Sequence, residues 1–76
     1  MFGICLLTPK EKEYFVEMAS KLNCDVTLIH GNIEIDGKSI MGVMAMDTTK
    51  NCFVKLSTKD HDVKTLFMYT LTEYLV

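Results

Sequence analysis

Residues 25–35 read Asp-Val-Thr-Leu-Ile-His-Gly-Asn-Ile-Glu-Ile, and they set the architecture of the chain. Val26 and Leu28 alternate with an aspartate and a threonine, which is the two-residue period of a strand with one buried face. Gly31-Asn32 then separates this segment from a second alternating segment, and such a pair between two strands is typical of a tight hairpin. The sequence therefore predicts two antiparallel strands whose apolar face needs a cover.

Upstream of the hairpin, the sequence predicts a strand over residues 2–7 and a helix over residues 9–22. Thr8 can cap this helix, proline suits the first helical position, and Glu11 completes a capping box. We interpret the charged run at residues 10–13 as a solvated helix face. Apolar side chains follow at helical spacing and form one stripe along the helix, made of Phe15, Met18, Ala19 and Leu22.

Downstream of the hairpin, three more elements are predicted: a short helix over residues 40–46, a strand over residues 52–57 and a last helix. Ser39 is placed to cap the short helix, and Ser57 and Thr58 are placed to cap the last one. Residues 48–51 have the composition of a polar loop. The last helix has apolar or small side chains at helical spacing, at Val63, Leu66, Phe67, Thr70, Leu71 and Tyr74.

The predicted order is β-α-β-β-α-β-α, which indicates an α+β fold. The apolar stripes of the first and last helices need a sheet face to bury them, and a four-stranded sheet with both helices on one face is the simplest solution. Seventy-six residues suit one small domain over residues 1–76, with no repeat or linker.

Charge and hydropathy exclude several classes of protein. The chain has 8 basic and 10 acidic residues, a net charge of −2, so it lacks the basic excess of a nucleic-acid binder. No apolar run approaches the roughly 20 residues that span a bilayer, and no secretory signal is visible. We therefore expect a cytoplasmic protein that binds neither nucleic acid nor membrane.

The cysteines and histidines do not form a recognisable site. Cys5, Cys24 and Cys52 are odd in number and lack a Cys-x-x-Cys pair, so we expect small core or strand residues rather than a disulfide framework or a metal site. His30 and His61 are expected at the surface. With no paired carboxylates and no nucleophile–base pattern, we predict neither an enzyme nor a cofactor, although an enzyme that uses a thiol stays an alternative.

Gly37-Lys38-Ser39 looks like the end of a phosphate-binding loop. That motif needs a glycine five residues before its second glycine, and position 32 is Asn32, so we do not expect nucleotide binding. A hydroxyl at a helix N-terminus can still act in two ways. Ser39 either serves as a cap alone or accepts a phosphate, whose charge a helix N-terminus tolerates well.

The short helix is too small to bury every apolar side chain. Val43 and Met46 can turn inward together, three residues apart, which leaves Ile40, Met41 and Met44 partly outside. Exposed methionines suit a surface that binds several partners, and packing into the core is the alternative.

Three segments resemble HPr, the histidine-containing phosphocarrier family of the bacterial sugar phosphotransferase system. They are Ala19-Ser20-Lys21, Asp25-Val26-Thr27-Leu28 and, above all, Gly-Lys-Ser-Ile-Met-Gly-Val-Met at residues 37–44. The similarity runs without a gap over residues 19–46. It implies the HPr open-faced β-sandwich, in which three helices lie on one face of four antiparallel strands.

The resemblance also implies which positions act. Family members carry phosphate on a histidine at the start of the first helix, and that position falls on Thr8, so phosphohistidine transfer is not expected. The serine that a dedicated kinase phosphorylates in the family falls on Ser39. The apolar partner contacts beside that serine fall on Ile40, Met41 and Met44.

The resemblance therefore implies a regulatory or adaptor protein that acts through Ser39 and its apolar neighbours. Its partners would be proteins of the phosphotransferase and carbon-regulation system, such as the serine kinase and a transcriptional regulator. A catabolite-repression variant of HPr also lacks the histidine. The alternative is a degenerate HPr-fold domain without phosphotransferase function, which binds other proteins or forms a homo-oligomer.

Overall fold

The computed structural model describes residues 1–47 and 51–76. In chain order its elements are β1 (Phe2–Ile4), α1 (Pro9–Ser20), β2 (Val26–His30), β3 (Ile33–Asp36), α2 (Ile40–Ala45), β4 (Cys52–Leu56), α3 (His61–Thr70) and the 3₁₀ turn η1 (Thr72–Tyr74). The polar loop predicted at residues 48–51 lies, apart from Asn51, outside the described residues.

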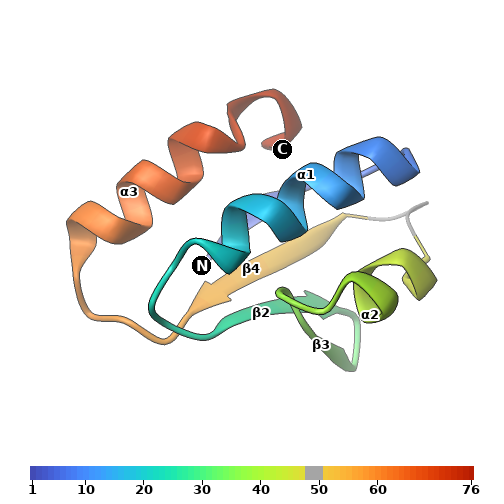
Figure 1. The fold of residues 1–76 in the computed structure, drawn as a ribbon, viewed down its shortest axis with the longest axis horizontal. Helices are drawn as coiled ribbons and strands as arrows, with labels where there is room; N and C mark the ends of the chain where they lie inside the picture. The colour runs from blue at the N-terminus through green and yellow to red at the C-terminus, as the bar shows by residue number, and fades with distance from the viewer. Residues whose placement is uncertain (48–50) are drawn as a thin grey trace.

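The four described strands form one antiparallel sheet in the order β1-β4-β2-β3. The three helices cover one face of it, with α1 and α3 running over the strands and α2 beside β3 (Figure 1). Side chains on the other face, such as Phe53 and Lys55, are exposed. The predicted α+β fold, an open-faced sandwich, is confirmed.

The central hairpin forms as predicted. Leu28 of β2 lies opposite Ile35 of β3, and His30 lies opposite Ile33 next to the turn. Gly31 has a φ of 62°, in the left-handed region that glycine adopts without strain, so it allows the chain to reverse within two residues.

The core lies between the sheet and the helices. Phe15 of α1 and Phe67 of α3 meet at its centre, with 5.8 Å between their ring centroids. Of the predicted α1 stripe, Phe15 and Ala19 are buried, and Met18 and Leu22 are half-buried. The largest fully buried side chains are Ile4, Leu6, Phe15, Val26, Leu28, Val43, Cys52, Val54 and Leu71.

Two of the predicted boundaries near the N-terminus are wrong. β1 ends at Ile4 rather than residue 7, because the chain turns there to present the Leu7 amide to the Glu11 carboxylate, 2.7 Å away. α1 ends at Ser20 rather than residue 22. The Lys21 and Leu22 amides bond three residues back, a tightening typical of a last helical turn.

The last helix also differs from its prediction. Asp60, not Ser57 or Thr58, is the N-cap, because its carboxylate accepts the Asp62 amide at 2.9 Å. The helix ends at Thr70. Leu66 was expected to be buried but is 65% exposed.

The C-terminal residues lie along the outer edge of β1. The Cys5 amide donates to the Tyr74 carbonyl at 2.8 Å, and the Val76 amide donates to the Gly3 carbonyl at 3.2 Å. Ile4 and Leu75 form an antiparallel bridge between these bonds. One edge of the sheet is therefore covered by the chain itself. Within the described residues, no helix has the length and apolar character needed to cross a membrane.

Candidate functional site

Ser39 is the N-cap of α2, as predicted. Its Oγ accepts the Gly42 amide at 3.2 Å, and its carbonyl accepts the Val43 amide at 3.0 Å. The side chain is half-buried. This hydroxyl therefore sits at the start of α2 with one hydrogen bond into the helix.

A tight turn holds Ser39 in this place. The Asp36 carboxylate accepts the Lys38 amide, and the Asp36 carbonyl accepts the Ser39 amide, both at 3.0 Å. Gly37 is buried, and its amide donates to the Val26 carbonyl at 2.7 Å. A Cβ on Gly37 would lie 2.7 Å from Val26 Cγ1 and 3.0 Å from the Val26 carbonyl oxygen. The glycine of this segment is therefore needed for close packing, not for a nucleotide.

The next turn of α2 presents an apolar patch, which we define as Ile40, Met41 and Met44. Met41 is 81% exposed, Ile40 is 42% exposed, and Met44 is half-buried. Val43 and Met46 are buried, as their three-residue spacing predicted. The patch thus lies on the outer side of the helix that Ser39 caps.

Two lysines fix the position of α2, and the sequence patterns did not indicate either contact. Lys12 was expected on a solvated face, yet it is only 8% exposed. Its Nζ donates to the carbonyls of Met44 at 3.1 Å and Met46 at 2.9 Å, at the end of α2. Lys38 Nζ donates to the Leu22 carbonyl at 2.7 Å, just after α1. Lys12 of α1 therefore holds the end of α2, and Lys38, just before α2, holds the backbone just after α1.

Thr8 is the N-cap of α1 and is exposed. Its Oγ1 accepts the Glu11 amide at 3.2 Å, and the Glu11 carboxylate accepts the Thr8 amide at 3.2 Å and the Leu7 amide at 2.7 Å. The predicted capping box is confirmed. The Glu11 carboxylate thus already binds amides at the start of this helix, and these amides could otherwise bind a phosphate.

We expect Thr8→Ala to lower the free energy of unfolding by about 1 kcal/mol, because it removes one half of the capping box. Thr8→Ser keeps the hydroxyl and is the matched control, with a stability close to that of the unmodified protein. Urea unfolding followed by circular dichroism measures both. If alanine and serine gave equal midpoints, the hydroxyl would not be the stabilising group.

The two histidines lie away from α1. His61 is exposed at the first position of α3. His30, predicted at the surface, is half-buried at the end of β2, and its Nδ1 is buried without a hydrogen-bond partner among the described residues. It lines an apolar hollow of about 540 Å³ between β3 and α2. Neither histidine lies at the start of α1, where Thr8 is the N-cap.

Cys52 lies where a thiol is not activated. Cys52 is buried, with its Sγ 3.6 Å from the sulfur of Met46. Burial, followed by the nearby Cys5 thiol, raises the pKa of Cys52 above its ordinary value. A raised pKa disfavours the reactive thiolate. Residues 1–47 and 51–76 also hold no group of three side chains suited to a metal ion.

Comparison with solved structures finds a protein of the same fold. The solved structure of Crh, described as a Bacillus subtilis catabolite repression containing protein, has a TM-score of 0.70 and 21% sequence identity. The match covers 96% of this chain and 87% of that one. That crystal structure is described as an intertwined dimer with a swapped domain. Comparison with curated protein sequences gives no match.

A family model matches most of the sequence downstream of Thr8. The model describes the PTS HPr component phosphorylation site, and it matches residues 13–75. The matched range contains Ser39 and the apolar patch, and it starts downstream of Thr8. Together with the four-stranded sheet and its three helices, this match shows that the chain belongs to the HPr family of the phosphotransferase system.

Proposed function

We propose that this protein is an HPr-like regulatory or adaptor protein, not an enzyme, that acts through Ser39 and the apolar patch. The observation that carries the proposal is their arrangement on α2. A serine hydroxyl caps the helix, and the next residues, Ile40 and Met41, expose apolar surface beside it. A modifiable hydroxyl next to apolar surface is the arrangement that lets one charge change alter the binding of a partner.

A phosphate on Ser39 is compatible with the local structure. The first turn of α2 holds no acidic residue that would repel it, and the Gly42 amide is directed at the serine oxygen. Lys38 is next in sequence, but its ammonium is bound to the Leu22 carbonyl at 2.7 Å. The phosphate and that carbonyl would therefore compete for the same ammonium group.

The same proposal excludes phosphohistidine transfer. Two features of α1 support this: threonine occupies the position where the family histidine is expected, and the Glu11 carboxylate binds the amides at the helix start. A phosphate at the start of α1 would be repelled by that carboxylate. His30 lies on β2 and His61 on α3, so neither replaces the missing side chain.

We place the protein in the cytoplasm as a single domain over residues 1–76, on the ground of its family. Its partners are a serine kinase and a transcriptional regulator of carbon use, or other proteins of the phosphotransferase system. The apolar patch provides the contact and Ser39 provides the switch. No cofactor or metal enters this function.

One observation favours a second candidate function, an oligomerising or protein-binding module without phosphotransferase partners. The structurally similar Crh is described as an intertwined dimer. The present chain also exposes the outer edge of β3, since β3 pairs with β2 alone among the described strands. A molar mass twice that of the monomer in light scattering, unchanged by Ser39→Ala, would support this candidate.

The central test is mass spectrometry after incubation with the HPr serine kinase of a related bacterium and ATP. We expect one added phosphate on Ser39 and none in Ser39→Ala. Ser20→Ala is the matched control, because Ser20 is exposed on α1 and should leave the phosphorylation unchanged. In parallel, incubation with phosphoenolpyruvate and the enzyme that charges HPr should add no acid-labile phosphate.

The patch is tested in the same system by Met41→Asp. It should weaken binding to the kinase at least tenfold, because it places a charge in the apolar contact, while Leu66→Asp on α3 should not. A kinase that modifies ordinary HPr but ignores Ser39 would refute the proposed function. A phosphohistidine on this chain would refute the exclusion of histidine transfer.

A further inference from the structure

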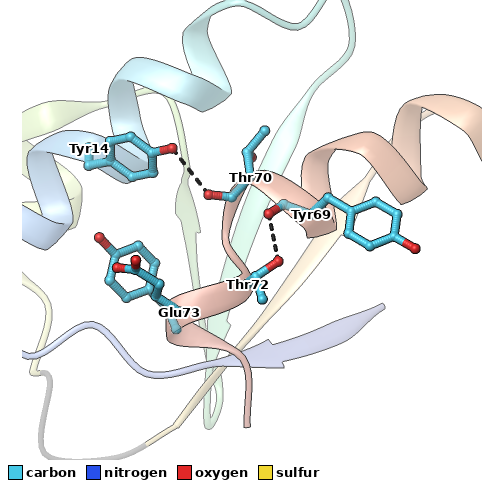
Figure 2. A pocket seen from close by; sticks show the side chains of 6 residues that line it. Tyr14, Tyr69, Thr70, Thr72 and Glu73 are labelled. Atoms are coloured by element: carbon cyan, nitrogen blue, oxygen red, sulfur yellow. Dashed lines mark hydrogen bonds between the residues drawn. The ribbon is translucent and has the colours of Figure 1, made fainter.

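A second site lies where α1 meets the end of α3. A hollow of about 470 Å³ opens there between α1 and η1, lined by Tyr14, Tyr69, Thr70, Thr72, Glu73 and Tyr74. Figure 2 shows the Tyr14 hydroxyl directed at the Thr70 carbonyl, 3.2 Å away, while the Tyr69 ring points away from the hollow. Tyr69 therefore contributes its backbone and not its ring.

The hollow is lined by aromatic rings, hydroxyl groups, the Glu73 carboxylate and backbone at the end of α3. The rings of Tyr14 and Tyr74 meet edge to face, with centroids 6.1 Å apart. The last turn of α3 holds no basic residue, so the negative end of this helix is not compensated within it. The Thr70 carbonyl, which accepts one hydrogen bond from Tyr14, keeps a second lone pair.

The one carboxylate that lines the hollow, that of Glu73, has no partner among the described residues. Glu73 is exposed on η1 and makes no hydrogen bond or ion pair in the part of the chain that the structure describes. No lysine or arginine lines the hollow. Partial burial, and then the charges of Glu73 and Glu11, raise the pKa of the Tyr74 hydroxyl above its ordinary value. Two carboxylates therefore act on the same aromatic wall.

We propose that this hollow binds a primary alkylammonium group. The ammonium donates hydrogen bonds to the Glu73 carboxylate and the Thr70 carbonyl, and its charge and its adjacent methylenes lie against the rings of Tyr14 and Tyr74. Anions are repelled by Glu73 and Glu11. Such a group could be a free diamine or the side chain of a lysine on another protein, since both present the same chemistry. The site shares no residue with Ser39 or the apolar patch.

The test is a titration of the ¹⁵N-labelled protein followed by nuclear magnetic resonance. The two probes are putrescine, for a free diamine, and Nα-acetyl-lysine amide, for a lysine side chain. We expect saturable shifts confined to the amides of residues 69–74 and of the facing part of α1. The tighter of the two probes identifies the source. The neutral alcohol 1-pentanol, which has the alkyl chain without the charge, should give no such shifts.

Variants test the contributions of the Glu73 charge and of the Tyr14 ring to binding separately. Glu73→Gln removes the charge at an exposed position and should weaken binding about fivefold, as one exposed ion pair of about 1 kcal/mol predicts. Tyr14→Leu should weaken it similarly. Tyr69→Ala is the matched control and should leave the affinity unchanged, because its ring points away (Figure 2). Equal affinity in Glu73→Gln, or an equal response to 1-pentanol, would overturn the proposal, as would the absence of any shift.

Discussion

Lys12→Met should lower the free energy of unfolding by about 3 kcal/mol, because it removes two charge-assisted hydrogen bonds and leaves carbonyls at the end of α2 without a donor. Methionine keeps the apolar stem and the volume, so the change isolates the ammonium group. In the protein that group lies 2.9 Å from the Met46 carbonyl and 3.1 Å from the Met44 carbonyl. A loss of this size lowers the melting temperature of a small domain by roughly 10–25 °C.

An opposing effect must be weighed. Burying a lysine costs desolvation energy, and apolar replacement of a buried charge is sometimes neutral or stabilising. Here the Met46 carbonyl remains buried after the substitution and the Met44 carbonyl partly buried, and no other donor among the described residues replaces the ammonium. We therefore expect the loss to exceed the gain.

Differential scanning calorimetry of Lys12→Met beside Lys10→Met measures the effect. Lys10 lies two residues earlier on α1 and is exposed, so its substitution should change stability by less than about 0.5 kcal/mol. If the two variants melted together, the hydrogen bonds to α2 would not stabilise the fold.

Gly37→Ala should cost about 2 kcal/mol through overpacking. The added methyl would lie 2.7 Å from Val26 Cγ1, 3.2 Å from Phe15 Cε1 and 3.0 Å from the Val26 carbonyl oxygen. The valine side chain could rotate away, but the carbonyl oxygen belongs to the hairpin backbone and cannot. The turn that carries Ser39 must therefore shift.

Gly3→Ala provides the matched control for that substitution. Its methyl would meet only side-chain atoms, Val76 Cγ2 at 3.0 Å and Phe53 Cε1 at 3.5 Å. We expect a cost below about 1 kcal/mol, because the Val76 and Phe53 side chains can adjust and alanine loses less backbone entropy than glycine. Chemical denaturation of the two variants compares them directly. A Gly37→Ala protein as stable as Gly3→Ala would show that the turn accommodates a methyl group without strain.

Local patterns were enough to predict the parts of this fold that depend on neighbouring residues. The capping box at Thr8 joins residues three apart, and the hairpin at Gly31 joins adjacent strands, so both appear in a short window of sequence. The same holds for Ser39 as a cap and for the outward direction of Met41.

The contacts that the sequence did not predict join residues far apart in the chain. Lys12 lies in a charged run that looks solvated, and only the approach of α2 to α1 turns its ammonium inward. Leu66 fits a buried helical spacing, yet the stripe of α3 that reaches the core is narrower and centres on Phe67. The tyrosine-lined hollow likewise exists only because α1 meets the end of α3.

The pairing of the C-terminal residues with β1 has a consequence for the mechanics of the fold. Residue 76 lies beside residue 3 and residue 74 beside residue 5, so the two segments run antiparallel, with residues 3 and 76 at one end of the pair. A pulling force applied between residues 3 and 76 would break these hydrogen bonds one after another, starting at that end, rather than load them all at once. The pairing of residues 74–76 with β1 therefore breaks first, which exposes the outer edge of β1 while β4, β2 and β3 are still hydrogen-bonded to one another.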